Sequence, residues 1–196
     1  MSSADATPAD VIGVEEARQI TGPYMALFRR CIEDAIRLVE DRERTDAEFF
    51  RVYPSGTRAA LVFWQIVHLA ETRFTGLEGA STSRNRGFLT ILIADKLEIR
   101  FKKLNRKGLP RLPRTRTART YSLQMRLLGM EEPTRATAGY QLNADGSLKD
   151  IILACQHGNE LLWTTPLPAD GAGFVAHPAT KKDDGDDKPK VRLKQG

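Results

Sequence analysis

Residues 88–102 read Phe88-Leu-Thr-Ile-Leu-Ile-Ala-Asp-Lys-Leu-Glu-Ile-Arg-Phe-Lys102, and this stretch decides the fold class. The first six residues are a short apolar run, which is typical of a strand buried on both faces. From Leu97 onward apolar and charged residues alternate, which is typical of a strand with one solvent-facing side. The intervening residues 94–96 are short enough to be a turn. The stretch therefore predicts a β-hairpin.

Upstream of the hairpin the periodicity is helical. Between Pro23 and about Arg44 apolar side chains recur at steps of three and four, which predicts an amphipathic helix. A second helix is predicted from Ser55 to about Phe74; it is apolar on nearly every side, which is typical of a buried central helix. Residues 77–87 contain glycines and are predicted to be a loop.

Downstream of the hairpin strand patterns return. A short helix is predicted at about 118–127, then strands at 135–142, 148–156 and 160–165 joined by two short turns. The predicted fold is α+β, with two N-terminal helices packed on one face of a roughly five-stranded, mainly antiparallel sheet. We expect a flexible arm at 1–12, a single domain at 13–168 and a disordered charged C-terminal tail at 169–196.

The overall composition excludes several classes of protein. The chain has 196 residues, with 41% hydrophobic and 28% charged, so it is neither collagen-like nor wholly disordered. Cys31 and Cys155 lie far apart in apolar stretches and are predicted to be buried thiols. The first ten residues have no signal-peptide pattern, and the longest apolar stretch is shorter than the ~20 residues of a membrane span. We therefore expect a cytoplasmic protein without membrane contact.

Positive charge is concentrated in residues 100–119, which we call the basic strap. Nine cations lie in it and no Asp or Glu: Arg100, Lys102, Lys103, Arg106, Lys107, Arg111, Arg114, Arg116 and Arg119. The formal net charge of the chain is +5, so the rest of the chain carries −4, the difference between +5 and +9. Arg84 and Arg86 lie in the predicted loop before the hairpin and add to this charge.

An extended strap with a cation every few residues could follow a phosphate backbone, and these nine residues are the predicted contacts. Phe101 and Tyr121 are nearby rings that could stack on an unpaired base, although Phe101 is expected to face the core. Contact with an acidic protein and simple solvation of the strap are the competing interpretations.

The sequence lacks the common catalytic motifs for nucleotide binding, serine hydrolysis, zinc peptidases and CxxC redox chemistry, so no cofactor is predicted. Its histidines are expected in a buried helix, a hairpin turn and the tail, namely His68, His157 and His177, and no metal site is predicted.

A metal-dependent nuclease is the least weak enzymatic interpretation. Asp95 at the hairpin turn and Glu98 on the next strand offer carboxylates for Mg²⁺, with Lys102 or Lys103 nearby. The pattern departs from a restriction-type D…E-x-K core, because Arg100 stands where that core has Lys.

Two stretches of the sequence resemble a group of known proteins. They are Leu97-Glu-Ile-Arg-Phe-Lys-Lys-Leu-Asn105, and Thr137-Ala-Gly-Tyr-Gln-Leu-Asn143 with the following Ile151–Gly158 and Leu162-Trp163. From about Ile91 to Leu167 the chain is similar to small uncharacterised bacterial proteins that are often encoded beside ImmA/IrrE-type metallopeptidases or in mobile, phage-defence-like loci. The resemblance implies a bacterial or phage setting and a partner gene, and no catalytic residues.

The sequence therefore predicts a non-enzymatic bacterial protein that binds nucleic acid or another polyanion through the basic strap. The alternative is an interaction subunit of a toxin–antitoxin or phage-defence system, whose protein partner carries the chemistry. An exposed edge of the three-stranded meander could pair with a second copy, so a homo-oligomer stays open.

Overall fold

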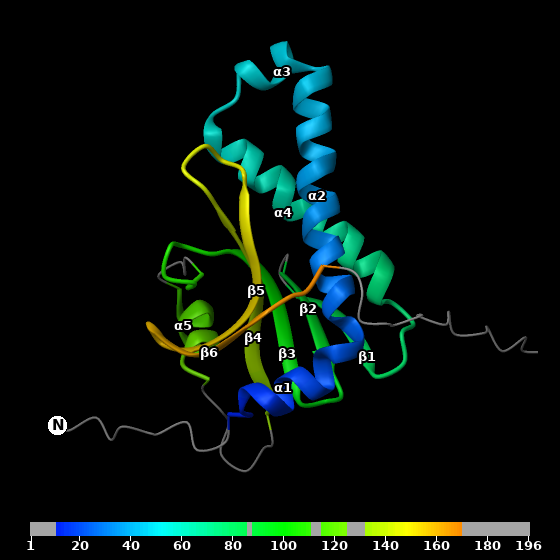
Figure 1. The fold of residues 1–196 in the computed structure, drawn as a ribbon, viewed down its shortest axis with the longest axis vertical. Coiled ribbons are helices and arrows are strands. Elements are labelled where there is room, and N and C mark those ends of the chain that lie inside the picture. The colour runs from blue at the N-terminus through cyan, green and yellow to red at the C-terminus, as the bar shows by residue number, and fades with distance from the viewer. Residues whose placement is uncertain (1–10, 86–87, 111–114, 125–131, 170–196) are drawn as a thin grey trace, which may run out of the picture.

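The computed structural model describes residues 11–85, 88–110, 115–124 and 132–169. Its elements are α1 (Val14–Thr21), the 3-10 helix η1 (Gly22–Tyr24), α2 (Met25–Thr45), α3 (Ala47–Arg51), α4 (Ser55–Phe74), β1 (Ala80–Asn85), β2 (Phe88–Ile93), β3 (Leu97–Lys103), α5 (Arg116–Ser122), β4 (Thr134–Leu142), β5 (Leu148–His157) and β6 (Glu160–Pro166). Helices lie against a six-stranded sheet (Figure 1), so the α+β prediction is confirmed. None of the described helices is long and apolar enough to cross a membrane.

The sheet follows the order of the chain, β1-β2-β3-β4-β5-β6, and neighbouring strands are antiparallel except for β3 and β4. The parallel pair requires a crossover between Lys103 and Thr134, and that crossover contains most of the basic strap. The predicted strand count was one too low, because β1 lies in the segment predicted to be a loop. Its sequence, ASTSRN, has little apolar content, and the pairing with β2 makes it a strand.

The β2–β3 hairpin is confirmed, with Ile93 opposite Leu97. Ala94 and Asp95 both have positive φ, 50° and 56°, as a tight hairpin turn requires. The prediction that β2 is buried on both faces was wrong in part. Its Leu89, Ile91 and Ile93 are buried, whereas the alternate residues are only half-buried.

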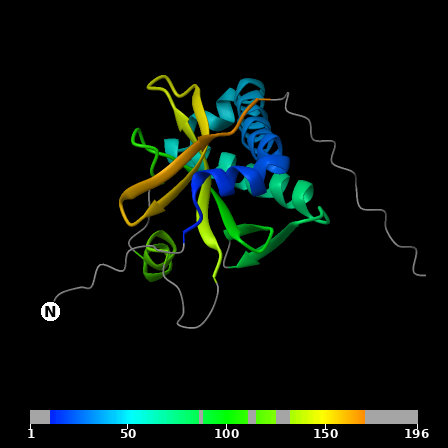
Figure 2. The same ribbon diagram turned by 60° about the horizontal axis from the view of Figure 1, so that its bottom comes forward.

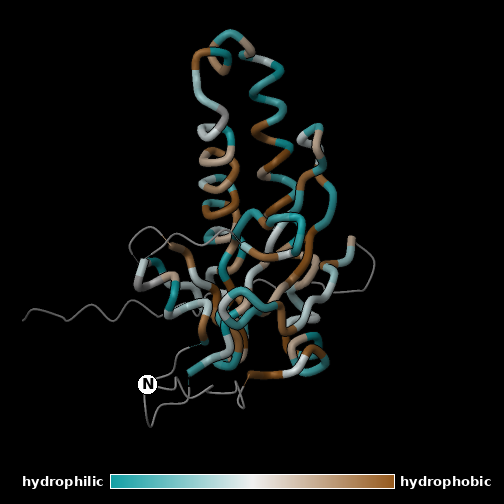
Figure 3. Tube along the Cα trace, turned by 90° about the vertical axis from the view of Figure 1, so that its left-hand side faces the viewer, coloured by the Kyte–Doolittle hydropathy of each residue, from teal (hydrophilic) through white to brown (hydrophobic). Residues whose placement is uncertain are grey.

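One face of the sheet carries α2 and α4. Phe28 of α2 is fully buried, with its ring centroid 4.6 Å from Phe74 of α4 and 5.8 Å from Phe101 of β3. The two helices continue beyond the sheet as a hairpin with α3 at its far end (Figure 1), where Figure 3 shows a hydrophobic segment.

The prediction that α4 is buried on every side was wrong. Trp64 is 47% exposed, and His68, expected in the core, is exposed as well. The reason is that α4 contacts α2 and the first three strands along one side and leaves its other side to solvent.

The opposite face of the sheet is covered in part by α5 and by the turn that follows β3, and Figure 2 shows α5 across the sheet from α2 and α4. The short helix was predicted at about 118–127, but α5 begins at Arg116. Thr115 provides its N-cap, since its Oγ1 accepts a hydrogen bond from the Ala118 amide at 3.2 Å. The C-terminal end of the predicted helix lies outside the described residues.

Candidate nucleic-acid interface

The basic strap begins in β3, turns sharply, and ends in α5. Leu104 lies directly over Gly139 of β4, where any side chain would collide with it. Asn105 closes the turn, because its Oδ1 accepts hydrogen bonds from the amides of Lys107 at 2.8 Å and Leu109 at 3.2 Å. Gly108, at φ 78°, is buried, and a Cβ at this position would lie 3.6 Å from Ile152 Cδ1. Residues 104–110 of the strap are therefore a compact turn held on the sheet, where an extended segment was expected, whereas residues 100–103 are part of β3.

Arg100 is occupied by interactions within the protein. Its guanidinium lies 2.8 Å from Glu98, donates to Thr90 Oγ1 at 3.2 Å, and stacks 4.0 Å from the ring centroid of Tyr121. Its side chain is 22% exposed. Contact between Arg100 and a ligand stays a prediction, but this geometry favours a structural role.

A second arginine completes this cluster. Arg135 of β4 lies 3.6 Å from the other Glu98 oxygen and also pairs with Glu132. The Tyr121 hydroxyl donates to the Ala136 carbonyl at 2.7 Å, and burial raises the pKa of Tyr121 above its ordinary value, with the Glu98 charge adding to the effect. Two carboxylates and two guanidinium groups thus balance beneath α5, and we call these four side chains with Tyr121 the charged cluster.

Lys102 is partly buried between rings. Its ammonium lies 5.0 Å from the ring centroid of Phe88 and 5.5 Å from that of Phe63 on α4. Burial lowers the pKa of Lys102, and the neighbouring charge of Arg100 lowers it further. Lys102 therefore links the strap to α4.

The remaining described cations of the strap are exposed. Lys103, Arg106, Lys107 and Arg119 have no ion pair or hydrogen bond from their side chains within the described residues. By contrast, each described Lys or Arg outside the strap interacts with a neighbouring group, with Arg51 as the exception. Arg111 and Arg114 lie outside the described residues, and Arg116 is placed only by its backbone.

Sequence reasoning missed two neighbouring rings of α4: Phe63, which lies beside Lys102 of the strap, and Trp64, whose ring centroid is 5.4 Å from that of Phe63. Arg84 extends from β1 to within 5.6 Å of the Trp64 ring. Their signal was hidden because α4 is so apolar that its sequence predicts burial on every side. The rings expected to meet a base are unavailable, since Phe101 is 2% exposed and Tyr121 is buried.

The carboxylates of the nuclease interpretation are not arranged as free ligands. Both oxygens of Glu98 face guanidinium groups, whereas Asp95 lies in the exposed hairpin turn. Among the described residues no group of three or more His, Cys, Asp and Glu side chains could hold a metal ion.

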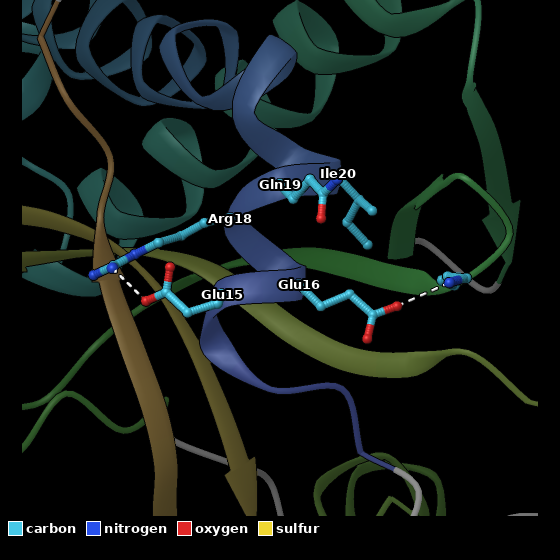
Figure 4. Close-up of a pocket in the computed structure, with 6 residues that line it drawn as sticks. Glu15, Glu16, Arg18, Gln19 and Ile20 are labelled. Carbon is cyan, nitrogen blue, oxygen red and sulfur yellow. Dashed lines mark hydrogen bonds and ion pairs between the residues drawn. The ribbon is translucent and has the colours of Figure 1, made fainter.

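A shallow depression runs beside α1 (Figure 4). Glu15 pairs with Arg18 at 2.8 Å, and Glu16 pairs with Lys96 of the hairpin turn at 2.8 Å. Since each carboxylate is neutralised by an exposed cation, the depression offers no concentrated charge for a ligand.

Comparison of the chain with protein-family models, with curated proteins and with solved structures found no match. The resemblance to proteins encoded beside metallopeptidases therefore stays a prediction.

Proposed function

We propose that this protein is a non-enzymatic binding protein that contacts nucleic acid or another polyanion through the basic strap. One observation carries the proposal: Lys103, Arg106, Lys107 and Arg119 are exposed cations whose side chains have no ion pair or hydrogen bond with the residues that the structure describes, whereas nearly all other described cations have such an interaction. Unpaired cations are free to exchange their counterions for phosphates, and this exchange is the main source of affinity for nucleic acids.

The contacts of the strap residues support a narrower proposal for which of them carry the binding. The charge of Arg100 is balanced within the charged cluster, and Lys102 is partly buried. We therefore expect the four exposed cations to contribute most, together with Arg111, Arg114 and Arg116. Since each phosphate contact on a duplex contributes about −0.9 to the slope of log K against log salt, the slope measures how many strap cations bind.

The test replaces all four exposed cations by Gln: Lys103→Gln, Arg106→Gln, Lys107→Gln and Arg119→Gln. A matched control carries Arg18→Gln, Arg37→Gln, Arg42→Gln and Arg44→Gln, which removes the same charge from arginines that are paired with carboxylates. Binding to a fluorescent single strand, a duplex and heparin is measured as a function of salt.

We expect the strap variant to lose affinity and to show a shallower salt dependence, and the control variant to change little. Equal weakening in both variants would mean that net charge matters and the strap does not. Absence of binding by the wild-type protein at low salt would overturn the proposal.

A second candidate function is supported by the far end of the helical hairpin. Phe49, Val52 and Tyr53 are 49%, 77% and 43% exposed there, and the Phe49 and Tyr53 rings lie 4.8 Å apart. An exposed aromatic group at the end of a projecting hairpin suits a protein partner, as expected for an interaction subunit of a bacterial toxin–antitoxin or phage-defence system. A stoichiometric protein partner that survives nuclease treatment and is lost in Phe49→Ser would favour this function.

A further inference from the structure

We infer that the ligand of the strap is single-stranded nucleic acid, and that Trp64 stacks on one of its bases. The inference rests on the proposed function and narrows it, because a polyanion without bases would gain nothing from an exposed indole. It depends on where Trp64 lies relative to the cations.

Trp64 differs from the other large side chains in the middle of α4. It is 47% exposed, whereas Ile66 and Val67 are 1% and 2% exposed. A single exposed apolar side chain is ordinary on a protein surface. What distinguishes Trp64 is that the guanidinium of Arg84 lies 5.6 Å from its ring centroid, so a cation accompanies the open ring.

Trp64 is also connected to the strap through a short series of contacts. Its ring lies 5.4 Å from Phe63, and Phe63 lies 5.5 Å from the ammonium of Lys102. Lys103, the next residue, is exposed, and its side chain has no ion pair or hydrogen bond among the described residues. The end of β3 therefore lies beside α4 at Phe63, the neighbour of Trp64, and a nucleic-acid strand bound at the strap would pass Lys102 to place a base on Trp64.

This arrangement selects an unpaired strand. The faces of bases inside a duplex are covered by neighbouring base pairs, whereas a single strand offers them to aromatic side chains. Surfaces that combine cations for the backbone with rings for the bases are typical of proteins that bind single strands without sequence preference. Phosphates would then contact the exposed cations of the strap while one base stacks on Trp64.

The experiment uses the full-length chain with Trp163→Phe, so that Trp64 is the only fluorescent indole. Trp163 belongs to β6, outside both the strap and α4, and its Nε1 donates to the Ile12 carbonyl at 2.9 Å. Fluorescence is followed during titration with a 12-nucleotide oligothymidylate and with a 12-base-pair duplex. Affinities of Trp64→Ala, Trp64→Phe and the control Leu38→Ala, an exposed residue of α2, are measured by anisotropy.

We expect the single strand to quench Trp64 and Trp64→Ala to weaken its binding about 5- to 150-fold, the range for loss of one stacked base. The salt dependence should not change, because no phosphate contact is removed. Trp64→Phe should retain most of the affinity, and Leu38→Ala and duplex binding should be unaffected.

Two outcomes overturn the inference in different ways. If Trp64→Ala binds the single strand as wild type does, while the four-residue strap variant does not, stacking is wrong and polyanion binding stands. If wild type binds neither single strand, duplex nor heparin, the proposed function fails and the inference fails with it.

Discussion

The two faces of β3 are stabilised in opposite ways. Leu97, Ile99 and Phe101 point toward α2 and α4 and are at most 2% exposed. Glu98 and Arg100 point toward α5, where they are 15% and 22% exposed and paired with each other. One face is a core of apolar contacts, and the other is a core of ion pairs and ring contacts.

The comparison shows that alternation in a strand identifies the two faces but does not show which face is open. The charged face of β3 was predicted to be solvated, and that prediction was wrong for Glu98 and Arg100. The crossover after β3 brings α5 over this face, and Tyr121 lies 4.0 Å from Arg100. Lys102, the next charged residue on this face, is partly buried as well.

The largest loss of stability is expected from a substitution in the core on the apolar face of β3. Phe28→Ala removes a fully buried ring that contacts Phe74 and Phe101, and it should lower the free energy of unfolding by about 3–5 kcal/mol. Urea denaturation followed by circular dichroism measures the change. Val52→Ala is the control, since Val52 is 77% exposed and its replacement should change stability by less than about 0.5 kcal/mol.

A smaller loss of stability is expected from a substitution on the charged face of β3. Glu98→Gln leaves Arg100 and Arg135 facing each other without their shared carboxylate, and it should cost about 2 kcal/mol, below the values for fully buried pairs. Asp41→Asn is the matched control, because Asp41 pairs with Arg44 in the solvent and should contribute under about 0.5 kcal/mol. A loss in Glu98→Gln that equals the control would show that the charged face does not stabilise the fold.

The features that could be predicted from the sequence were those formed by residues close together in the chain. The hairpin at 88–102, the long helix ending near Arg44 and the meander follow from patterns within about ten residues. The charged cluster could not be predicted, because Glu98 and Arg135 become neighbours only through the parallel pairing of β3 with β4. The exposure of Trp64 was equally hidden, since helix periodicity indicates which residues are apolar and the rest of the fold decides which of them are covered.

The smallest loss of stability is expected from removal of the Tyr121 hydroxyl, and the size of this loss depends on pH. Tyr121→Phe removes the hydrogen bond to the Ala136 carbonyl and should cost about 1 kcal/mol at pH 7. Burial raises the pKa of Tyr121 above its value of 10.0 in the unfolded chain. Its contribution is therefore complete below pH 10 and is lost as the pH rises from there toward the folded pKa, since only the unfolded chain releases the proton.

Between pH 10 and 11 the wild type should lose about 1 kcal/mol relative to Tyr121→Phe, so the advantage of the hydroxyl at neutral pH should vanish. Urea denaturation of both proteins at pH 7, 10 and 11 measures this difference, and the raised pKa values of Tyr24 and Tyr140 affect both proteins alike. A difference that stays constant with pH would mean that Tyr121 ionises as easily in the folded protein as in the unfolded chain. In that case α5 does not exclude solvent from the charged face, and the two faces of β3 differ less in burial than their contacts indicate.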